Sequence, residues 1–482
     1  MIAEHKHLVE QGARLVELRL DYINGEVGIK RLLADRPCPV VIACRRESDG
    51  GKWTGSEEAR RLLLRTAIAE GVEYIDLEDD IAASVPRFGK TKRIVSHHDF
   101  RKTPEDLEGL HRKLCALDPD IVKIAAVANH PQDNLRMLRM VRASKVPMVG
   151  ICMGDIGVPT RLLCGKFGAV FTYATFHHER ALAPGQLSFE QMTDVYGYDR
   201  INADTEVYGV VADPVGHSLS PQIHNAAFRE LGLNKVYVPF RVPREDLPAF
   251  MDEAPQWGIC GLSVTIPHKE EVVKKLSEAD GAVRGIGACN TVVFEGDKRL
   301  GFNTDYRAAM SSLEESLEIP PGQENSLSGR TALVLGSGGV GMAIGYGLVR
   351  RGAQVVATDG LAKQSAALAK RLNCRAVDWN ARHSVAADLL FNCTPVGMHP
   401  EVDAAPFDKH YLKPSMLVFD AVYNPENTLL IKEARSRNCK VVTGVDMFVR
   451  QACLQFKHFT GRDGPAELMR EVIKKATAAV KY

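Results

Sequence analysis

The sequence has 482 residues and an almost balanced charge, with 61 Lys and Arg against 60 Asp and Glu. At roughly 150 residues per domain, this length predicts about three structural units. The balance argues against general nucleic-acid binding, which usually shows a basic excess. The 11 cysteines contain no C-x-x-C pair, which argues against a disulfide scaffold or a Cys-built zinc site and favours reduced thiols in the cytoplasm.

Residues 1–195 alternate between apolar strand candidates and segments with helical spacing. The apolar runs are 15–20, 39–44, 74–78, 93–98, 120–125, 147–153 and 169–174. Apolar strands joined by helical crossovers are typical of a parallel sheet in an α/β fold, and we predict a TIM-type (β/α) barrel. Because such a barrel has eight strands and the runs supply seven, we expect its first strand to be missing here and to lie upstream of Met1.

The remaining sequence predicts two further α/β units. A polar, aperiodic stretch, 196–205, is typical of a linker, and we place a substrate-binding domain at 205–310. The apolar run and glycine-rich turn TALVLGSGGVG then predict a Rossmann domain for NAD(P) at 311–445. C-terminal helices at 446–482 are expected to return to the substrate domain. The uncharged run 331–349 is long enough for a membrane span, but its six glycines argue against one, so we expect no membrane contact.

Charged residues stand at special positions of the first unit. Glu17, Arg19 and Asp21 alternate along one strand and therefore share a face. Further candidates lie in or after other strands: Arg45, His98, Lys123, Arg161 and Gln186. Active sites of barrels are built at the C-terminal ends of the strands, so we expect these side chains to meet there.

Lys123 stands inside an apolar strand, DIVKIA. Burial disfavours the charged form of an amine and makes it nucleophilic towards ketones. The alternative, a structural ion pair with Glu17 or Asp49, is about equally supported by composition. His98 follows His97, and a His-His-Glu trio lies at 177–179, but without a spaced partner motif we predict no metal.

These residues together resemble the type I 3-dehydroquinate dehydratase family over nearly all of 1–195. The shared motifs are E-x-R-x-D at 17–21, Arg45 before D-G-G, S-x-H-D-F at 96–100, V-K-I-A around Lys123, Arg161, and A-P-G-Q ending at Gln186. The resemblance implies that Lys123 forms a Schiff base with the C3 ketone of the substrate and that His98 removes the C2 proton. Substrate-binding roles are implied for Glu17, Arg19, Arg45, Arg161 and Gln186.

Two positions depart from this family's pattern. Asp49 stands where the family commonly has Glu, and this shorter carboxylate is expected to orient His98 less well. Leu182 stands where a serine is expected, which removes one hydrogen bond to the substrate.

A glycine-rich turn, GSGGVG, follows the apolar strand TALVL and precedes a helical segment. This context predicts dinucleotide binding, because glycines allow the pyrophosphate to approach the helix N-terminus closely. The cofactor-binding candidates here are Gly336, Gly338, Gly339 and Gly341. Asp359 ends the next strand, where an acid can accept hydrogen bonds from the ribose 2′-OH, although an exposed turn residue is the alternative.

The motifs of the second unit resemble the shikimate dehydrogenase family over about 205–475. They are G-H-S-x-S-P, S-V-T-x-P-x-K, G-A-x-N-T, N-T-D, G-x-G-G-x-G, N-x-T-P-x-G-M and a late Gln in D-M-F-V-R-Q. The resemblance implies that Lys269 and Asp305 form the catalytic pair. It implies substrate contacts for Ser218, Ser220, Thr265, Asn290, Tyr423 and Gln451, and a nicotinamide-side lining of Asn392, Thr394, Gly444 and Met447. For either serine alone, a helix N-cap is the plainer interpretation.

The cofactor choice departs from the family default, NADP(H). An Asn-Arg-Thr run often binds the 2′-phosphate in this family, whereas this sequence has Asp359, Gly360 and Leu361. A carboxylate repels a phosphate, so Asp359 favours NAD(H).

The two halves would catalyse consecutive steps of the shikimate pathway, dehydration of 3-dehydroquinate and reduction of 3-dehydroshikimate to shikimate. The expected partners are these small molecules, with a homodimer as an option and no nucleic acid or membrane. Two alternatives stay open: a catabolic NAD-dependent quinate/shikimate dehydrogenase, and an active dehydrogenase fused to an inert barrel that serves as an interaction module.

Overall fold

The computed structural model describes residues 1–177, 185–216, 218–320 and 323–478. It divides into two compact units, 1–205 with 238–250 and 206–237 with 251–482. None of the helices in these described ranges is long and apolar enough to cross a membrane. The run 331–349 instead forms a strand and most of a helix, β13 and α11, in the second unit.

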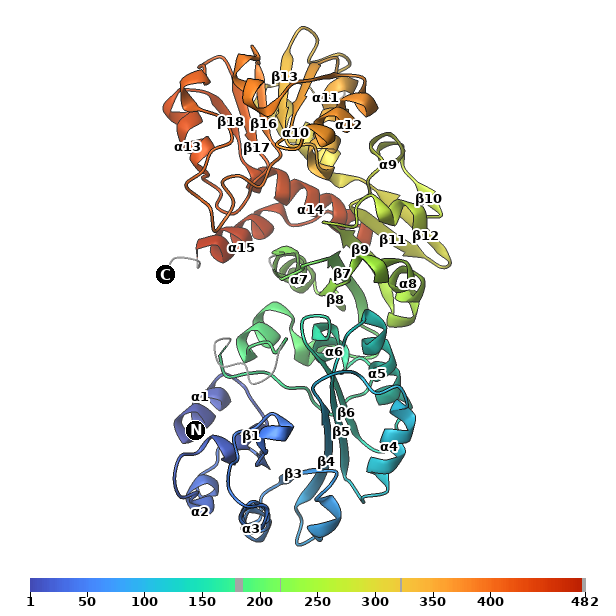
Figure 1. Cartoon of the computed structure of the whole chain (residues 1–482), viewed down its shortest axis with the longest axis vertical. Helices are drawn as coiled ribbons and strands as arrows, with labels where there is room; N and C mark the ends of the chain where they lie inside the picture. Colours follow the sequence, from blue (N-terminus) through green and yellow to red (C-terminus); the bar gives the residue numbers. More distant parts are fainter. Residues whose placement is uncertain (178–184, 217, 321–322, 479–482) are drawn as a thin grey trace. The chain divides into compact units, whose positions relative to one another are not determined.

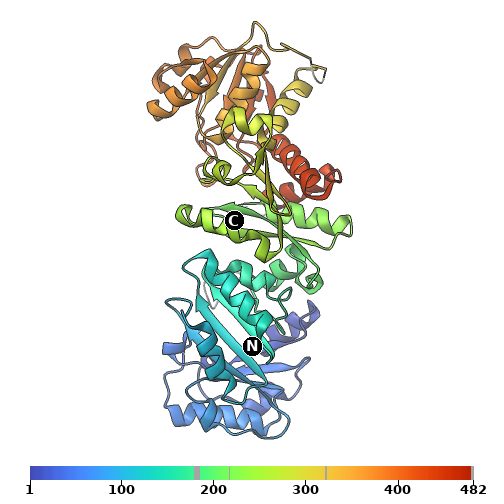
Figure 2. The same cartoon turned by 90° about the vertical axis from the view of Figure 1, so that its right-hand side faces the viewer.

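The first unit contains a six-stranded parallel sheet in the order β1-β2-β3-β4-β5-β6 (Figure 1). Its strands are β1 (Val16–Arg19), β2 (Val40–Ala43), β3 (Tyr74–Glu78), β4 (Lys92–Asp99), β5 (Ile121–Val127) and β6 (Met148–Met153). The helices of this unit are α1 (Ile2–Glu10), α2 (Ile29–Leu33), α3 (Glu57–Ala69), α4 (Leu107–Cys115), α5 (Pro131–Ala143) and α6 (Val158–Leu163). The strands run alongside one another in Figure 2, with α4 and α5 packed on one face.

The predicted parallel sheet is confirmed, but the seventh strand expected at 169–174 is wrong. This segment is not part of a strand ladder in the described structure. Val170 N donates to Met148 O at 3.2 Å, but regular pairing with β6 does not continue from there. Apolar composition made the segment resemble a strand, whereas a strand also needs a repeated set of backbone partners.

Local sequence explains how the crossover helices begin. Ser56 caps α3 by accepting a hydrogen bond from Ala59 N at 3.2 Å. Pro131 stands at the start of α5, where its missing N–H costs nothing. The inner face of the sheet carries a core of Val41, Ile94, Ile121, Val149 and Ile151. The helices thus bury the outer face and leave polar side chains on the inner face free to build a site.

In the described ranges from 206 onwards, the chain forms two six-stranded sheets. The first is mixed, in the order β10 (Glu278–Ala279), β12 (Lys298–Phe302), β11 (Thr291–Glu295), β9 (Ile259–Val264), β7 (Glu206–Ala212) and β8 (Lys235–Arg241). The second is parallel, in the order β15 (Arg375–Ala376), β14 (Gln354–Thr358), β13 (Thr331–Leu335), β16 (Leu389–Asn392), β17 (Leu417–Asp420) and β18 (Lys440–Val442). Counted from β13, this second order is 3-2-1-4-5-6, that of the Rossmann fold.

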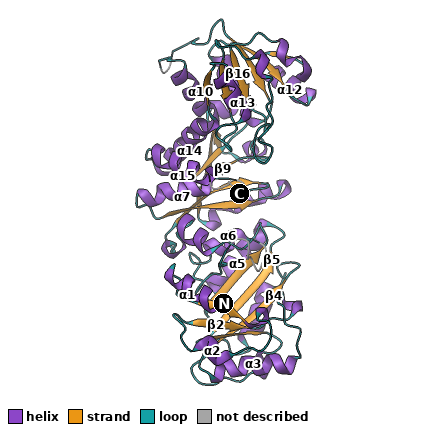
Figure 3. Ribbon diagram, turned by 90° about the vertical axis from the view of Figure 1, so that its left-hand side faces the viewer, coloured by secondary structure: helices purple, strands orange, loops and turns teal. Residues whose placement is uncertain are grey.

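Helices cover these sheets in the way the sequence predicts. They are α7 (Ser220–Glu230), α8 (Leu247–Glu253), α9 (Gly281–Ile286), α10 (Thr304–Ser316), α11 (Gly339–Arg350), α12 (Ala362–Leu372), α13 (Leu429–Ser436), α14 (Gly444–Thr460) and α15 (Ala466–Ala478). The C-terminal segment is helical as expected, with α14 packed on α10 and α15 on α7 (Figure 3).

Candidate active sites

A cavity of about 960 Å³ lies on the inner face of the sheet in the first unit. All the site residues predicted there line it: Glu17, Arg19, Arg45, His98, Lys123, Arg161 and Gln186. The sheet brings five of them together, because Glu17 and Arg19 lie on β1, His98 on β4 and Lys123 on β5, and Arg45 follows β2. Arg161 lies on α6, and Gln186 lies in the segment after it. Leu182 lies outside the described residues, as do His178 and Glu179 of the His-His-Glu trio.

Lys123 lies among acidic and phenolic partners in this cavity. Its Nζ donates to Asp76 Oδ2 at 2.9 Å and to Tyr173 OH at 2.9 Å, and it lies 3.6 Å from Glu17 Oε2. The sequence also allowed an ion pair between Lys123 and Asp49, and this pairing is wrong. The Asp49 carboxylate turns back towards its own loop and accepts a hydrogen bond from Arg46 Nε at 2.6 Å.

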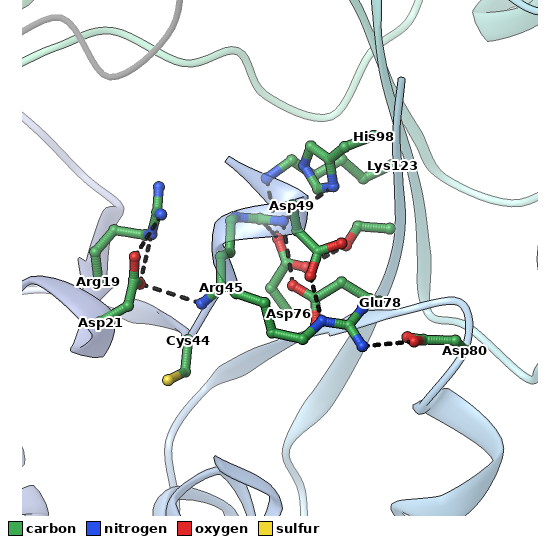
Figure 4. Close-up of polar contacts among 12 residues, drawn as sticks. Arg19, Asp21, Cys44, Arg45, Asp49, Asp76, Glu78, Asp80, His98 and Lys123 are labelled. Atoms are coloured by element: carbon green, nitrogen blue, oxygen red, sulfur yellow. Dashed lines mark hydrogen bonds and ion pairs between the residues drawn. The ribbon is translucent and has the colours of Figure 1, made fainter. Parts of the chain in front are cut away.

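Asp76 anchors the charged residues around this amine (Figure 4). Its Oδ2 also accepts from Arg45 Nη2 at 2.6 Å, and its Oδ1 accepts from Ser96 Oγ at 2.5 Å. Burial alone would raise the pKa of Asp76, but the charges of Arg45 and Lys123 outweigh burial and hold it far below its usual range. Asp76 is therefore a permanent anion that holds two cations in place.

A second buried carboxylate, Glu78, extends the network. It lies 3.4 Å from Arg45 Nη1 and accepts from Arg60 Nη1 at 2.7 Å. Neither Asp76 nor Glu78 was predicted from the sequence. The signal was present, because YIDLE places both acids on alternate positions of an apolar strand, the same pattern that singled out Glu17 and Arg19.

His98 lies beside the same guanidinium. Arg45 Nη1 is 3.1 Å from His98 Nδ1, and since a guanidinium only donates, Nδ1 is the acceptor. Burial lowers the pKa of His98 well below its usual value, and the charges of Arg45 and Lys123 lower it further. The imidazole is therefore neutral near pH 7, the form that a general base requires.

The remaining cations of this cavity are held in different ways. Arg19 donates to both carboxylate oxygens of Asp21, at 2.9 and 2.7 Å. Asp21 also accepts from Arg45 N and Lys52 N, so that it joins β1 to the next loop. Burial lowers the pKa of Arg161 to about 10, which leaves the guanidinium charged near pH 7 and able to bind a carboxylate.

The candidate substrate residues of the second unit gather at one edge of the mixed sheet. Strands β7 and β9 are parallel, so Ser218 and Ser220 after β7 and Thr265 after β9 lie at the same edge. Strand β11 is antiparallel to β9 and begins at that edge next to Asn290, whose carbonyl accepts from Val264 N at 2.8 Å. Topology thus assembles residues that lie far apart in the sequence.

The predicted catalytic pair forms in the structure. Lys269 Nζ donates to Asp305 Oδ2 at 2.6 Å, and the two side chains are 13% and 9% exposed. Asp305 lies in the first turn of α10, where the helix dipole stabilises a carboxylate. A backbone bond from Cys289 N to Lys269 O at 2.7 Å fixes the loop that carries the lysine.

Asn290 has its amide occupied by the protein. Its Nδ2 donates to Thr304 Oγ1 at 2.9 Å, and its Oδ1 accepts from Thr304 N at 2.8 Å. Gln455 on α14 donates to the Asn290 carbonyl at 3.0 Å and accepts from Ser263 Oγ at 2.8 Å. The sequence did not point to Gln455, which lies one helical turn beyond the predicted Gln451. Gln451 itself is 7% exposed.

Tyr423 stacks on Phe448 with ring centroids 4.3 Å apart. Gly444 allows this arrangement, since a Cβ there would lie 2.2 Å from Val422 O. Met447 lies within the apolar core beneath the Rossmann sheet. These contacts give Gly444 and Met447 packing roles in this part of the structure.

The glycine loop has the geometry that a dinucleotide needs. Gly336 has φ +93, and a Cβ at Gly341 would lie 2.0 Å from Gly336 O, so neither position tolerates a side chain. A Cβ at Gly338 would meet no atom within 4 Å, which leaves space before α11. The hydroxyl oxygen of Ser337 is buried and has no hydrogen-bond partner among the described residues, which suits a phosphate oxygen. The residues therefore fit a nicotinamide dinucleotide.

Asp359 lies against this loop. Its Oδ2 accepts from Ser337 N at 2.7 Å and its Oδ1 from Leu361 N at 2.9 Å. These two bonds place the carboxylate beside the glycine turn, where the sequence predicted that the ribose is recognised.

Asn392 closes the other side of the loop. It accepts from Thr394 Oγ1 at 2.6 Å and donates to Asp420 Oδ1 at 2.9 Å. Burial raises the pKa of Asp420 to about 6. Asn392 and Asp420 thus shape the turn that carries Thr394.

No cluster of three or more His, Cys, Asp or Glu in the described ranges could hold a metal ion. His97, the neighbour of His98, lies 3.5 Å from Asp79 Oδ2 instead.

The folds and sites define an enzyme with two centres, a lyase and a dinucleotide-dependent dehydrogenase. Residues 1–203 match the family model of type I 3-dehydroquinase, and 210–292 match the shikimate dehydrogenase substrate-binding domain. Residues 331–419 match the model of NADP oxidoreductase, coenzyme F420-dependent, and 444–474 match the shikimate 5'-dehydrogenase C-terminal domain.

Individual proteins agree with these matches. The chain is 37% identical to the chloroplastic bifunctional 3-dehydroquinate dehydratase/shikimate dehydrogenase of Arabidopsis thaliana, over 98% of this chain and 82% of that protein. A solved shikimate dehydrogenase in complex with NADP+ is 35% identical, with a TM-score of 0.53 over 57% of this chain and 97% of its own. Quinate dehydrogenase from Corynebacterium glutamicum in complex with NAD is 31% identical, with a TM-score of 0.51 over 56% and 99%.

The chain belongs to the family of bifunctional 3-dehydroquinate dehydratase/shikimate dehydrogenases. It is an enzyme of the shikimate pathway with 3-dehydroquinate dehydratase and shikimate dehydrogenase activities, as the sequence predicted.

Proposed function

We propose that Lys123 is the Schiff-base lysine of the dehydratase and that Lys269 and Asp305 are the catalytic pair of the dehydrogenase. The observation that carries the first role is the position of Lys123 Nζ in the 960 Å³ cavity, which His98 and Arg161 also line. A nucleophilic amine, a neutral base and a carboxylate-binding cation are the three groups that this reaction needs.

In this proposal, the Lys123 amine adds to the C3 ketone and water leaves, giving an iminium that withdraws electrons from C2. His98 takes the C2 proton, the electron pair moves towards the iminium, and the C1 hydroxyl departs with the proton that His98 returns. Arg45 now occupies the Nδ1 lone pair of His98, so the substrate has to draw the guanidinium away first. Hydrolysis of the iminium then releases 3-dehydroshikimate and restores Lys123.

The other residues of the cavity bind and orient the substrate in this scheme. Arg161 pairs with its carboxylate, because a buried guanidinium gains most from a charged acceptor. Glu17, Arg19, Arg45 and Gln186 bind hydroxyl groups and hold the amine. Asp49 accepts a hydrogen bond from Arg46 in this structure, so we assign it no role in orienting His98.

In the second centre, Lys269 donates a proton to the C3 oxygen of 3-dehydroshikimate while that carbon is reduced. Asp305 holds the amine through the 2.6 Å bond and so fixes its direction. When bound, the reduced nicotinamide supplies the hydride for this step. Ser218 and Ser220 bind the carboxylate, and Thr265, Asn290, Tyr423 and Gln451 surround the hydroxyl groups in this proposal.

The dinucleotide would be held by the loop at Gly336, Gly338, Gly339 and Gly341. Asp359 would face the ribose, and Asn392, Thr394, Gly444 and Met447 would shape the nicotinamide side. We also propose that the chain is divided into domains at 1–195, 205–310, 311–445 and 446–482.

Borohydride trapping tests the first role. The unmodified protein mixed with 3-dehydroquinate and borohydride should gain a reduced substrate adduct on the peptide that contains Lys123. An adduct on another lysine would contradict the proposal, and so would the absence of an adduct in protein that still dehydrates the substrate. Absence of both the adduct and the dehydration would favour an inert first unit.

Quinate oxidation is the second candidate activity, favoured by the position of Asp359 and by the NAD-bound relative. A kcat/KM for quinate with NAD above that for shikimate would support it.

We also propose a cytoplasmic or similarly reducing location, because all 11 cysteines are free. Cell fractionation tests the location, and light scattering tests the proposed homodimer by a mass of twice 53.0 kDa.

A further inference from the structure

The phenol of Tyr173 meets the nucleophilic amine of the dehydratase site directly. Its hydroxyl oxygen lies 2.9 Å from Lys123 Nζ, and the same nitrogen lies 4.1 Å from the ring centre. The ring packs edge-on against Phe171, with centroids 5.6 Å apart. It also packs on the inner core of Val41, Ile94, Ile121, Val149 and Ile151. This packing holds the hydroxyl group at the amine.

A lysine ammonium has to lose a proton before it can attack a ketone. Asp76, its nearest carboxylate, is badly suited to take that proton. Both of its oxygens already accept hydrogen bonds, from Arg45, Ser96 and Lys123. A group that stays ionised in the field of two cations stabilises the ammonium rather than deprotonating it.

Glu17 is the other carboxylate near the amine. Its Oε2 lies 3.6 Å from Lys123 Nζ, which is too far for a hydrogen bond, and this atom is buried with no hydrogen-bond partner among the described residues. A buried carboxylate oxygen without a hydrogen-bond partner is unfavourable, so this atom is open to a donor. The Tyr173 phenol lies close to both groups, since it accepts from Lys123 Nζ at 2.9 Å and interacts with the Glu17 carboxylate, so it is the candidate carrier of a proton between them.

Tyr173 has the properties of that carrier. Burial raises the pKa of Tyr173 well above its usual value, and the charges of Glu17 and Asp76 raise it further. The phenol therefore keeps its proton at rest, and it can give that proton away only while it receives another.

We propose that Tyr173 is a further catalytic residue of the dehydratase, which carries the proton of Lys123 to Glu17 through its hydroxyl group. This proposal rests on the Schiff-base role proposed for Lys123. The ammonium gives one proton to the phenol oxygen while the phenol gives its own proton to Glu17, and the neutral amine then adds to the C3 carbonyl carbon. One nitrogen-bound proton and the proton on Glu17 reach the former carbonyl oxygen, which leaves as water as the C=N bond forms. One ketone and one ammonium thus give one iminium and one water, with the charge unchanged.

Tyr173→Phe tests the relay because it removes the hydroxyl and keeps the ring. The full-length protein is mixed with 3-dehydroquinate for a single turnover and quenched with borohydride at successive times, and the adduct on Lys123 is measured by mass spectrometry. We expect adduct formation to slow by about 10²-fold, the usual contribution of one proton-transfer group. Tyr74→Phe is the matched control, since Tyr74 lines the same cavity but its ring lies over Lys92, 5.6 Å from that amine, and its rate should stay within about twofold.

A measurement on the unmodified protein keeps the test independent of folding in the variant. Adduct formation in mixtures of H2O and D2O should slow with a curved dependence on the deuterium fraction, because two protons move together. A Tyr173→Phe rate within about twofold of the unmodified protein, or a rate indifferent to D2O, would overturn the relay. If the unmodified protein forms no adduct on Lys123, the Schiff-base role itself fails, which separates the two proposals.

Discussion

Asp359 should make the dehydrogenase prefer NAD to NADP. Its carboxylate is held by Ser337 N at 2.7 Å and Leu361 N at 2.9 Å, so turning away from a 2′-phosphate would break both bonds. Two unit charges about 4 Å apart repel by about 4 kcal/mol at an effective dielectric of about 20. Since Asp359 is partly exposed, screening leaves about 1–3 kcal/mol, which corresponds to a kcat/KM preference of about 10- to 100-fold.

Shikimate oxidation with each cofactor measures this preference. Asp359→Asn removes the charge but keeps an oxygen for Ser337 N, so the preference should fall to near unity. Adding Gly360→Arg should reverse it, because a Cβ at Gly360 meets no atom within 4 Å and an arginine can pair with the phosphate. Asp408→Asn is the control, since Asp408 accepts from His410 N at 2.9 Å in a turn that precedes β17, away from the glycine loop. A tenfold preference for NADP in the unmodified protein would show that Asp359 does not face the ribose.

Three further predictions concern buried groups. His224 is stacked on Tyr237, and burial lowers the pKa of His224 to about 3. Only the unfolded state therefore gains the proton between pH 6.5 and 5, and the free energy of unfolding of the second unit should fall by about 2 kcal/mol over this range. Denaturation of His224→Phe at both pH values should lack that loss, and a variant with the same pH dependence of unfolding as the unmodified protein would contradict the prediction. Asp76→Asn should destabilise the first unit by about 3–5 kcal/mol in urea unfolding, because two buried cations lose their partner, and a loss under 1 kcal/mol would be incompatible with the network. Gly341→Ala should abolish dinucleotide binding in a fluorescence titration while dehydration continues, since its Cβ would lie 2.0 Å from Gly336 O; normal binding would refute the close approach.

Much of the first site could be predicted because strand alternation and strand ends are local properties. Glu17, Arg19 and Lys123 were placed correctly on one cavity by their position in apolar strands. What the sequence could not supply was the pairing, because a partner such as Asp76 lies 47 residues from Lys123. The prediction of a strand at 169–174 was wrong for a related reason, because a strand ladder depends on backbone partners elsewhere in the sequence.

The second site shows a different limit. Asn290 and Asn392 stand in the predicted motifs, yet the structure has their amides bonded to Thr304 and Asp420. A motif marks a position as chemically demanding, but it does not say whether the side chain faces a ligand or holds the backbone. Gln455 was missed because a buried glutamine on a helix leaves no periodic signal.

The central claim is that one chain carries two independent lysine centres, and assays of both half-reactions in two variants test it most directly. Lys123→Ala should lower the dehydration of 3-dehydroquinate by at least about 10³-fold and leave shikimate oxidation within about twofold, and Lys269→Ala should do the reverse. A folded Lys123→Ala protein that dehydrates at the unmodified rate, or one that has lost both activities, would contradict the account.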